Sequence, residues 1–516
     1  MNQKFLFVTL CCALAGALAS HPQEASAMWK TDFRYQHVSA RPRIEACYTD
    51  ATRKALDISA ENYRMIIALH SKAGQRIRTL SPYGSNVLAG GGGYLRLTGA
   101  DGRVYSSLNS KTPSRINIYR RGPYYIETHW LDVTLTDDKG EVVPIKCEVV
   151  FYSYPEKTHV GVILHVTGAF TVRDAALVFD FDGDSCETLS SHCRMVKRSP
   201  GARTCALLCP APKKVDNVTS EAAPDALRVC NYIYHRDNHE GADASWKEGD
   251  KPAAYFEIFP LPSGKPSAAL EAELRPLLSA SISASQGRNL GYDPIRGCYT
   301  MQTDNRGSFS YHFYKNPNDY EVAEFSIRND NLPRKVYILH ETRKHPGLVE
   351  CGVVLDEDGR TLPITVQISK NFAGEKEEPF YNPNDTPFSE TIFPLYLDKG
   401  ESRKMTSLHL YQNWGNHPLK QFSSLGAWMD YYHMSTGVTE TTCYVPFLFA
   451  GLPGVSIADF RPMSQEMWTS QPQHDNVAGH SFLRYQDENG KWHYVEYTGT
   501  TFRSTGPNWA DMSMSY

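Results

Sequence analysis

The segments YYIETHWLDVTL (124–135), TDDKG (136–140) and VVPIKCEVVFY (142–152) indicate the fold of this chain most clearly. The two outer segments are rich in β-branched and aromatic residues, and the middle one combines Asp, Lys and Gly as tight turns do. Together they predict an antiparallel β-hairpin. The same pattern recurs at 94–105 around the turn ADG (100–102), and further strands are expected at 160–166 and 176–181.

Helical periodicity is scarce along the rest of the chain, so we expect a mainly β protein. Large antiparallel β-sandwich units are predicted, followed by a small mixed C-terminal region. The expected division is a signal peptide (1–27), a β-sandwich unit (28–185), a cysteine-rich insertion (186–250), a second β-sandwich unit (251–410) and an aromatic, His-rich region (411–516). The sequence ends at SMSY (513–516) with no closing strand expected, which leaves open that this last region belongs to a longer chain.

A weak internal repeat links the two expected β-sandwich units. The segment LTDDKGEVVPI (135–145) resembles LDEDGRTLPI (355–364), and both continue into alternating strand patterns. One interpretation is that the two units are related. The other is that any hairpin with an acidic turn has this appearance.

Composition and targeting limit the class of protein. The 516 residues carry a formal net charge of −4, so there is no basic excess to neutralise nucleic acid, and that class is excluded. Lys4 precedes a short apolar run at 5–19 that ends in the small-residue motif ALA (17–19), which predicts a cleaved signal peptide. We therefore expect a secreted or periplasmic protein with no membrane span in the mature chain.

Ten of the twelve cysteines remain after removal of the signal peptide, and five of them lie within 45 residues. In an exported protein this density predicts a disulfide cluster, with a zinc site as the alternative. The members of the cluster are Cys186, Cys193, Cys205, Cys209 and Cys230. No zinc spacing is matched well, so no metal and no cofactor is predicted.

Two other motifs receive structural interpretations. The run GGGG (90–93) lacks the Gly-Lys-Ser/Thr ending of a phosphate loop and is expected to form a flexible bend. The segment DFDGD (180–184) places three carboxylates at alternate positions. We expect a solvated strand end there, with a calcium loop as the alternative.

The chain from His409 to its end concentrates aromatic and polar chemistry, because five of the eight tryptophans lie there. Aromatic rings stack on sugar faces and neighbouring polar groups bind hydroxyls, so this region predicts a carbohydrate site. The expected substrate-binding residues are Trp414, Trp428, His433, Trp468, His474 and Asp475. Asp430, Glu440 and Asp475 would be the nearest carboxylates for glycan hydrolysis, and no spacing rule selects among them.

A catalytic hypothesis uses the same region. Cys443 follows TETT (439–442), a capped entry to a short helix whose N-terminus would lower a thiol pKa. His480 and Glu496 lie on either side of a predicted turn and would face each other across two strands. The order of these residues resembles the transglutaminase-like cysteine hydrolases over about residues 435–500. The resemblance implies Cys443 as nucleophile, His480 as base and Glu496 as the orienting group, although that family usually has Asp in the third position.

Three function classes follow from these patterns. The first is an exported protein that binds or processes carbohydrate. The second is a cysteine hydrolase that acts on peptide or amide bonds, and the third is a non-catalytic surface module.

Overall fold

The computed structural model describes residues 44–208, 218–261, 285–371, 388–412, 423–444, 459–462, 484–494 and 499–515, with short interruptions. The predicted signal peptide lies outside these residues. Within them there is no α-helix, and one 3-10 helix spans Arg236–His239. The prediction of a mainly β fold is confirmed, with large antiparallel sheets and one small mixed sheet. The described part of the chain contains no helix that could cross a bilayer.

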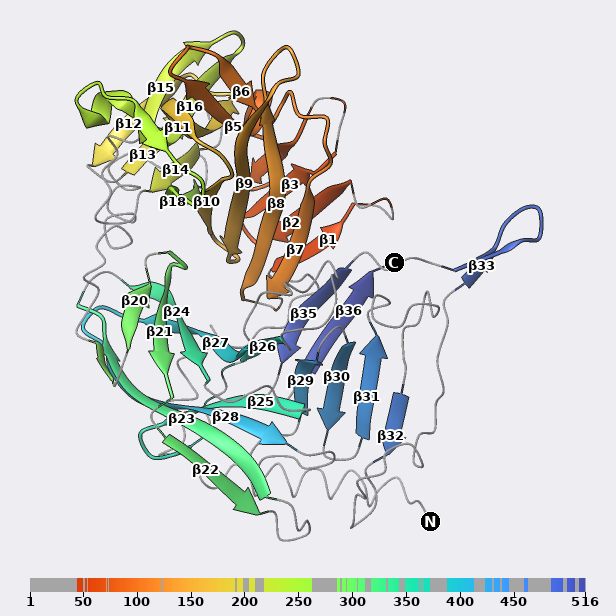
Figure 1. Ribbon diagram of the computed structural model, residues 1–516. Helices are drawn as coiled ribbons and strands as arrows, with labels where there is room; N and C mark the ends of the chain where they lie inside the picture. The colour runs from red at the N-terminus through yellow and green to blue at the C-terminus, as the bar shows by residue number, and fades with distance from the viewer. Residues whose placement is uncertain are drawn as a thin grey trace, which may run out of the picture. The chain divides into compact units, whose positions relative to one another are not determined.

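The first β-sandwich is built from two long runs of paired antiparallel strands (Figure 1). The first run consists, in order of pairing, of β36 (Ala510–Ser515), β35 (Gly499–Thr505), β1 (Ile44–Tyr48), β2 (Ala55–Ala60), β3 (Tyr63–Ala68), β4 (Arg76–Pro82), β5 (Leu88–Gly99), β11 (Phe170–Phe181), β16 (Ala226–His235) and β15 (Val218–Ala223). The second run consists of β7 (Arg115–Arg120), β8 (Ile126–Thr136), β9 (Val142–Ser153), β10 (Thr158–Val166), β18 (Ala253–Leu261), β14 (Thr204–Leu208), β13 (Cys193–Lys197) and β12 (Ser185–Ser190).

Two short strands complete this unit. Strand β6 (Val104–Ser106) pairs with both β5 and β8 and so connects the two runs, and β17 (Ala244–Trp246) pairs with β11. The predicted hairpin is β8 and β9, which pair from Ile126 opposite Ser153 to Thr136 opposite Val142. Trp130 and Phe151 point inward and are fully buried. Alternation of apolar and polar residues thus sets which face of this hairpin enters the core.

The strands of the predicted cysteine-rich insertion pair into the same sheet, and β18 pairs with β10 and β14. The boundary predicted at residue 251 therefore falls before the last strand of the first unit. Cys186 and Cys230 are free thiols, so the predicted disulfide cluster does not form through either of them. Cys193 lies in β13 and Cys205 in β14, but the side chains of these two cysteines are not among those described. Cys209 lies outside the described residues.

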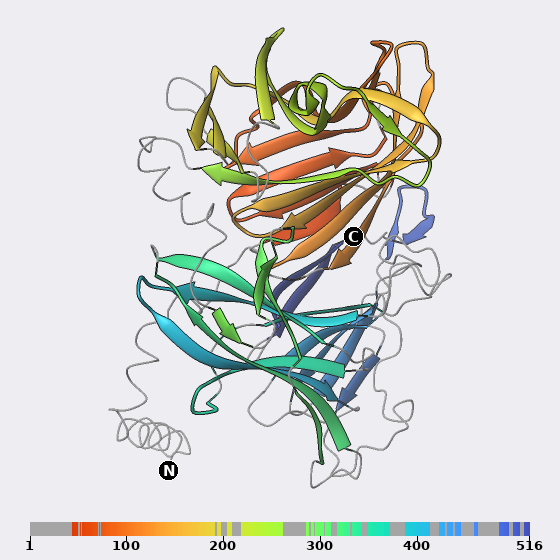
Figure 2. The ribbon, with the colours of Figure 1, turned by 60° about the vertical axis from the view of Figure 1, so that its left-hand side comes forward.

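The second β-sandwich has two five-stranded sheets. The first contains β19 (Ser285–Gly287), β22 (Asn305–Ser310), β23 (Pro317–Arg328), β28 (Ser402–Gln412) and β25 (Val349–Asp356), and Figure 2 shows β23 and β28 side by side. The second contains β20 (Gly291–Asp293), β21 (Cys298–Gln302), β24 (Arg334–Glu341), β27 (Phe388–Leu397) and β26 (Gln367–Asn371), with β21 and β24 parallel.

The two sheets of this second unit face each other across a partly polar interior. Phe325 of β23 lies 6.2 Å from Phe393 of β27, measured between ring centroids. Ser407 of β28 lies 3.0 Å from Nδ1 of His340 on β24, and both side chains are fully buried. A buried hydrogen-bonded layer of this kind is stable only because its polar atoms find partners.

The remaining strands form a four-stranded antiparallel sheet and a separate hairpin. The sheet contains β29 (Ser423–Trp428), β30 (Tyr431–Thr436), β31 (Thr439–Tyr444) and β32 (Asp459–Pro462). The hairpin is β33 (Arg484–Gln486) with β34 (Trp492–Tyr494). The chain also has the closing strand β36, which the sequence did not predict.

Candidate functional site

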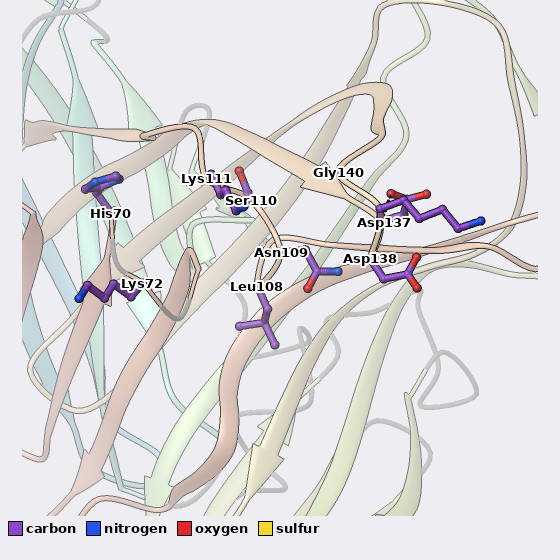
Figure 3. Close-up of a pocket in the computed structure, with 10 residues that line it drawn as sticks. His70, Lys72, Leu108, Asn109, Ser110, Lys111, Asp137, Asp138 and Gly140 are labelled. Carbon is purple, nitrogen blue, oxygen red and sulfur yellow. Dashed lines mark hydrogen bonds between the residues drawn. The ribbon is translucent and has the colours of Figure 1, made fainter.

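Three loops of the first β-sandwich line an open cavity of about 590 Å³. His70 and Lys72 come from the loop between β3 and β4, residues 108–111 from the loop between β6 and β7, and residues 137–140 from the turn between β8 and β9. Figure 3 shows the 108–111 loop between the other two. Apart from Gly140, which has no side chain, Leu108 is the one apolar residue of this lining, and the other eight residues are polar or charged. The volume falls within the range of ordinary small-molecule sites.

Hydrogen bonds below the cavity floor fix the first two loops against each other. The buried Ser107 donates from Oγ to the carbonyl of Gln75 over 2.8 Å and accepts at its own carbonyl from the Gln75 N–H over 3.0 Å. Gly74 has φ +79°, and a Cβ at this position would overlap the Leu108 carbonyl. Glycine is therefore required where these loops meet, both for its backbone conformation and for its missing side chain.

Further contacts tie the loop between β6 and β7 to β8. The Asn109 amide donates to the carbonyl of Thr136 over 3.1 Å, and the hydroxyls of Ser110 and Thr134 lie 2.5 Å apart. Trp130 donates from its indole N–H to Ser114 Oγ over 2.8 Å, and that hydroxyl donates to the Leu69 carbonyl over 3.0 Å. These contacts fix the loops that line the cavity against β8 through the protein's own groups.

The turn at Asp137 supplies a buried carboxylate to the cavity wall. Its Oδ1 accepts the backbone N–H groups of Lys139, at 3.0 Å, and Glu141, at 2.8 Å. Its Oδ2 is buried and accepts no hydrogen bond within the described structure, and the Arg103 guanidinium lies 3.9 Å away. Asp137 is only 3% exposed. A buried carboxylate oxygen that accepts no hydrogen bond is costly.

The same turn is built at two other places in the chain. Asp356 accepts the N–H groups of Asp358 and Arg360, and Asp487 accepts those of Asn489 and Lys491, each through Oδ1. In each turn the glycine three residues later has positive φ: +92° at Gly140, +75° at Gly359 and +78° at Gly490. The likeness between 135–145 and 355–364 is therefore explained by the local chemistry of an acidic turn, which also forms at 487–490.

Past that turn both segments first fold back along the preceding strand, and the Leu362 N–H donates to the Val354 carbonyl over 2.8 Å. They then diverge, because the chain after Asp137 stays in the sheet of β8 as β9, whereas the chain after Leu362 forms β26 in the facing sheet. At Asp487 the second carboxylate oxygen lies 2.7 Å from His493 Nε2, whereas Oδ2 of Asp137 accepts no hydrogen bond within the described residues.

A second polar cluster is buried at the end of β7 and β8. Arg120 donates to Glu127 over 2.6 Å and to Glu390 of the second β-sandwich. His129 lies 2.7 Å from Glu127 through Nε2 and 2.7 Å from Glu148 through Nδ1. Burial opposes a charged imidazole here, but the hydrogen bonds to Glu127 and Glu148 prevail and raise the pKa of His129 to about 9.

The two carboxylates of this cluster, Glu127 and Glu390, have pKa values shifted in opposite directions. Burial by itself would raise the pKa of Glu127, but Arg120 and His129 lower it below its usual range. Burial raises the pKa of Glu390, and the charge of Arg120 only partly offsets this. Gln367 of β26 adds an amide contact between the two units, because its Oε1 accepts the N–H of Tyr125 at 2.9 Å and its Nε2 donates to the Tyr125 carbonyl at 2.7 Å. The cluster joins the two β-sandwiches rather than opening to a cavity among the described residues.

The motif 180–184 does not form a calcium site in the described structure. Asp180 is 4% exposed and accepts the Arg228 guanidinium at 2.8 Å, so the carboxylate already has a cation. The described residues hold no group of three or more His, Cys, Asp or Glu side chains placed for a metal ion. The glycine run 90–93 lies inside β5, where the Gly91 N–H donates to Asp180 Oδ2 over 3.3 Å.

Most of the sequence-predicted site residues lie outside the described part of the chain. These are Trp414, Asp430, Trp468, His474, Asp475, His480 and Glu496. Trp428 ends β29 and His433 lies in β30, where it pairs with Gly426 and Thr442, but their side chains are not among those described.

Cys443 does not begin a helix, as the sequence suggested, but lies in β31 opposite Tyr432. The run TETT precedes it within the same strand, so the predicted helix N-terminus is not formed at this cysteine. The predicted turn between His480 and Glu496 is present as the hairpin of β33 and β34. The cysteine hydrolase remains a prediction, because neither His480 nor Glu496 is among the described residues.

Sequence reasoning missed the cavity and the buried cluster. Eight polar residues of three surface loops have no distinctive spacing, and only the fold brings them together. A signal did exist for the cluster: Glu127 and His129 are two apart on a strand, so they share one face of an otherwise apolar segment.

Comparisons with known proteins assign no family. No family model matches the chain, and no curated protein does. Among solved structures the chain is similar to one titled "Polysaccharide Lyase BACCELL_00875", with 8% identity and a TM-score of 0.26 over 75% of this chain and 47% of that one. The chain thus spans about half the length of that structure. A likeness at this level assigns neither a fold family nor an activity.

Proposed function

We propose that this protein is exported and binds carbohydrate, and that the cavity between the 70–72, 108–111 and 137–140 loops holds a sugar unit. The observation that carries the proposal is Asp137 in the wall of a polar pocket: its Oδ2 is shielded from solvent and accepts no hydrogen bond within the described residues, so a sugar hydroxyl would reach it once the side chain turns toward the pocket. A sugar hydroxyl is a donor of suitable size. The Asn109 and Ser110 side chains supply further polar groups in the same lining.

The geometry supports binding better than catalysis at this place. His70, Asp137 and Asp138 are residue types used in acid–base chemistry, but within the described residues His70 makes no hydrogen bond to either carboxylate. The export part of the proposal rests on the short apolar run at 5–19 and its small-residue ending. The predicted aromatic contacts at Trp414, Trp428 and Trp468 remain predictions.

The test is a glycan array screen with the full chain, followed by titration of every hit with Asp137→Asn. Asparagine keeps an oxygen for the two backbone N–H groups and replaces the free acceptor with an N–H₂ donor. We expect the affinity to fall by roughly tenfold or more, in line with the 1–3 kcal/mol cost of an unsatisfied buried group.

Asp356→Asn is the matched control. It makes the same substitution in the same kind of turn, where Asp356 likewise accepts two backbone N–H groups but is not one of the residues that line this cavity. The control should bind as the wild type does. Absence of any glycan hit, or equal affinity of the two variants, would contradict the proposal for this cavity.

A further inference from the structure

The hairpin of β33 and β34 presents two exposed aromatic rings in a fixed geometry. Among the described residues, Tyr485 is 55% exposed and Trp492 is 52% exposed. Such exposure is unusual for large aromatic side chains, which ordinarily bury most of their surface. Isolated two-stranded hairpins are only marginally stable, so the contacts that order this one are informative.

The turn of the hairpin is fixed by its own side chains. Asp487 accepts the N–H groups of Asn489 and Lys491, and its N–H donates to the Lys491 carbonyl over 2.9 Å. Its second carboxylate oxygen lies 2.7 Å from His493 Nε2. The Gln486 amide donates to the Gly490 carbonyl over 2.7 Å. The turn and the ring of His493 therefore form one hydrogen-bonded unit.

Each face of the hairpin carries one ring that is held by a neighbour. Tyr485 pairs with His493, and their rings stack at 5.2 Å with 19° between the planes. On the other face the Arg484 guanidinium lies 4.2 Å from the centre of the Trp492 ring. More than half of Trp492 is still exposed, so the guanidinium covers only one side of the indole.

We propose that this hairpin is a second carbohydrate contact, in which the free face of Trp492 stacks on the C–H face of a pyranose ring. Tyr485 offers a similar surface on the opposite face. Arg484, held beside the indole, is placed to donate to the hydroxyls at the rim of the bound ring. The inference rests on the proposed function, because it takes carbohydrate as the ligand, but it uses a separate surface.

The polar groups around the rings favour a sugar over other occupants. The tip residues Asp487, Glu488 and Lys491 are charged, which opposes insertion into a bilayer. The strands are three residues each, which is too short for stable strand addition by another chain. A pyranose has one apolar face and a rim of hydroxyls, so it suits an exposed aromatic ring that has hydrogen-bond donors beside it.

The test uses affinity electrophoresis of the full chain through gels that contain xylan, laminarin, pectin or chondroitin sulfate. Trp492→Ala removes the ring, and Trp492→Phe keeps a smaller one. Tyr83→Ala is the control, because it removes an exposed aromatic residue from another turn. We expect Trp492→Ala to raise the dissociation constant by roughly three- to tenfold, as loss of one stacked ring does. The dissociation constant of Trp492→Phe should lie between those of Trp492→Ala and the wild type.

The outcomes separate this inference from the function itself. If a polysaccharide retards the wild type and Asp137→Asn is retarded less, while Trp492→Ala is retarded equally, the cavity binds glycan and the hairpin does not. If none of the four polysaccharides retards the wild type, both proposals are overturned for these glycans. Equal weakening by Tyr83→Ala would also overturn the inference, because the effect would then not be specific to the hairpin.

Discussion

Arg120 holds two buried carboxylates that come from different β-sandwiches, so its replacement by methionine tests the contact between the units. The guanidinium donates to Glu127 over 2.6 Å and also to Glu390, and its side chain is 11% exposed. Methionine fills a similar volume without a charge. Glu127 would keep His129 and Tyr125 as partners, whereas Glu390 would lose the one cation to which it is hydrogen-bonded in the described structure.

The expected cost follows from these contacts. Two hydrogen bonds between charged groups contribute about 1.5–3 kcal/mol each, and removal of one member of a buried ion pair typically costs about 3–5 kcal/mol. We therefore expect Arg120→Met to lower the free energy of unfolding by about 3–5 kcal/mol at pH 8. Burial already raises the pKa of Glu390, and loss of Arg120 raises it further, so the cost should shrink as the pH falls and Glu390 takes up a proton.

Urea unfolding followed by tryptophan fluorescence and circular dichroism measures this cost at pH 8 and pH 5. Arg328→Met is the control, because Arg328 forms an ion pair with Asp330 in which both side chains are about half exposed. Such pairs contribute little, about 0–1 kcal/mol. Glu390→Gln in the Arg120→Met background should recover part of the loss by removing the unpaired charge. An Arg120→Met protein within 1 kcal/mol of the wild type at pH 8, or no recovery in the double variant, would refute the reasoning.

Two further predictions concern the second β-sandwich and the cavity floor. Burial and the nearby charge of His409 lower the pKa of His340 to about 3, so the folded state disfavours protonation of this imidazole. The free energy of unfolding should therefore fall as the pH drops below about 6.5, by at most roughly 3 kcal/mol at pH 4. His340→Gln should reduce the difference between the urea midpoints at about pH 7 and pH 4, and an unchanged difference would count against this. Gly74→Ala should lower the free energy of unfolding by more than about 2 kcal/mol and impair glycan binding, because the new Cβ would overlap the Leu108 carbonyl. Gly102→Ala, at φ +83° with open space around it, should lower that free energy by only about 1 kcal/mol. Thermal melts of the two variants measure both losses, and equal losses would contradict the overlap.

The fold could be predicted from local patterns, because strand alternation and acidic turns are properties of short segments. The hairpin at 124–152 forms with its turn at Asp137, as its residues indicate. The pairing partners could not be predicted in the same way. Strand β35 pairs with β1, over 450 residues earlier in the chain, and nothing in either segment specifies that partner.

The candidate site was harder to predict than the fold for a physical reason. Its walls come from loops whose residues are ordinary for surface turns. Its main chemical feature is the buried Oδ2 of Asp137, which accepts no hydrogen bond from any described residue, and only the folded structure reveals this. The aromatic-rich C-terminal region gave a stronger sequence signal. Its described part includes the hairpin with the exposed ring of Trp492, a residue that the sequence did not single out as a sugar contact.

A crystal structure of the full chain soaked with a glycan identified on the array tests the central claim most directly. The account predicts density for a sugar ring in the cavity lined by His70, Ser110 and Asp137, with one hydroxyl about 2.5–3.0 Å from Asp137 Oδ2. Density for the glycan elsewhere on the molecule, with this cavity holding only solvent, would contradict it.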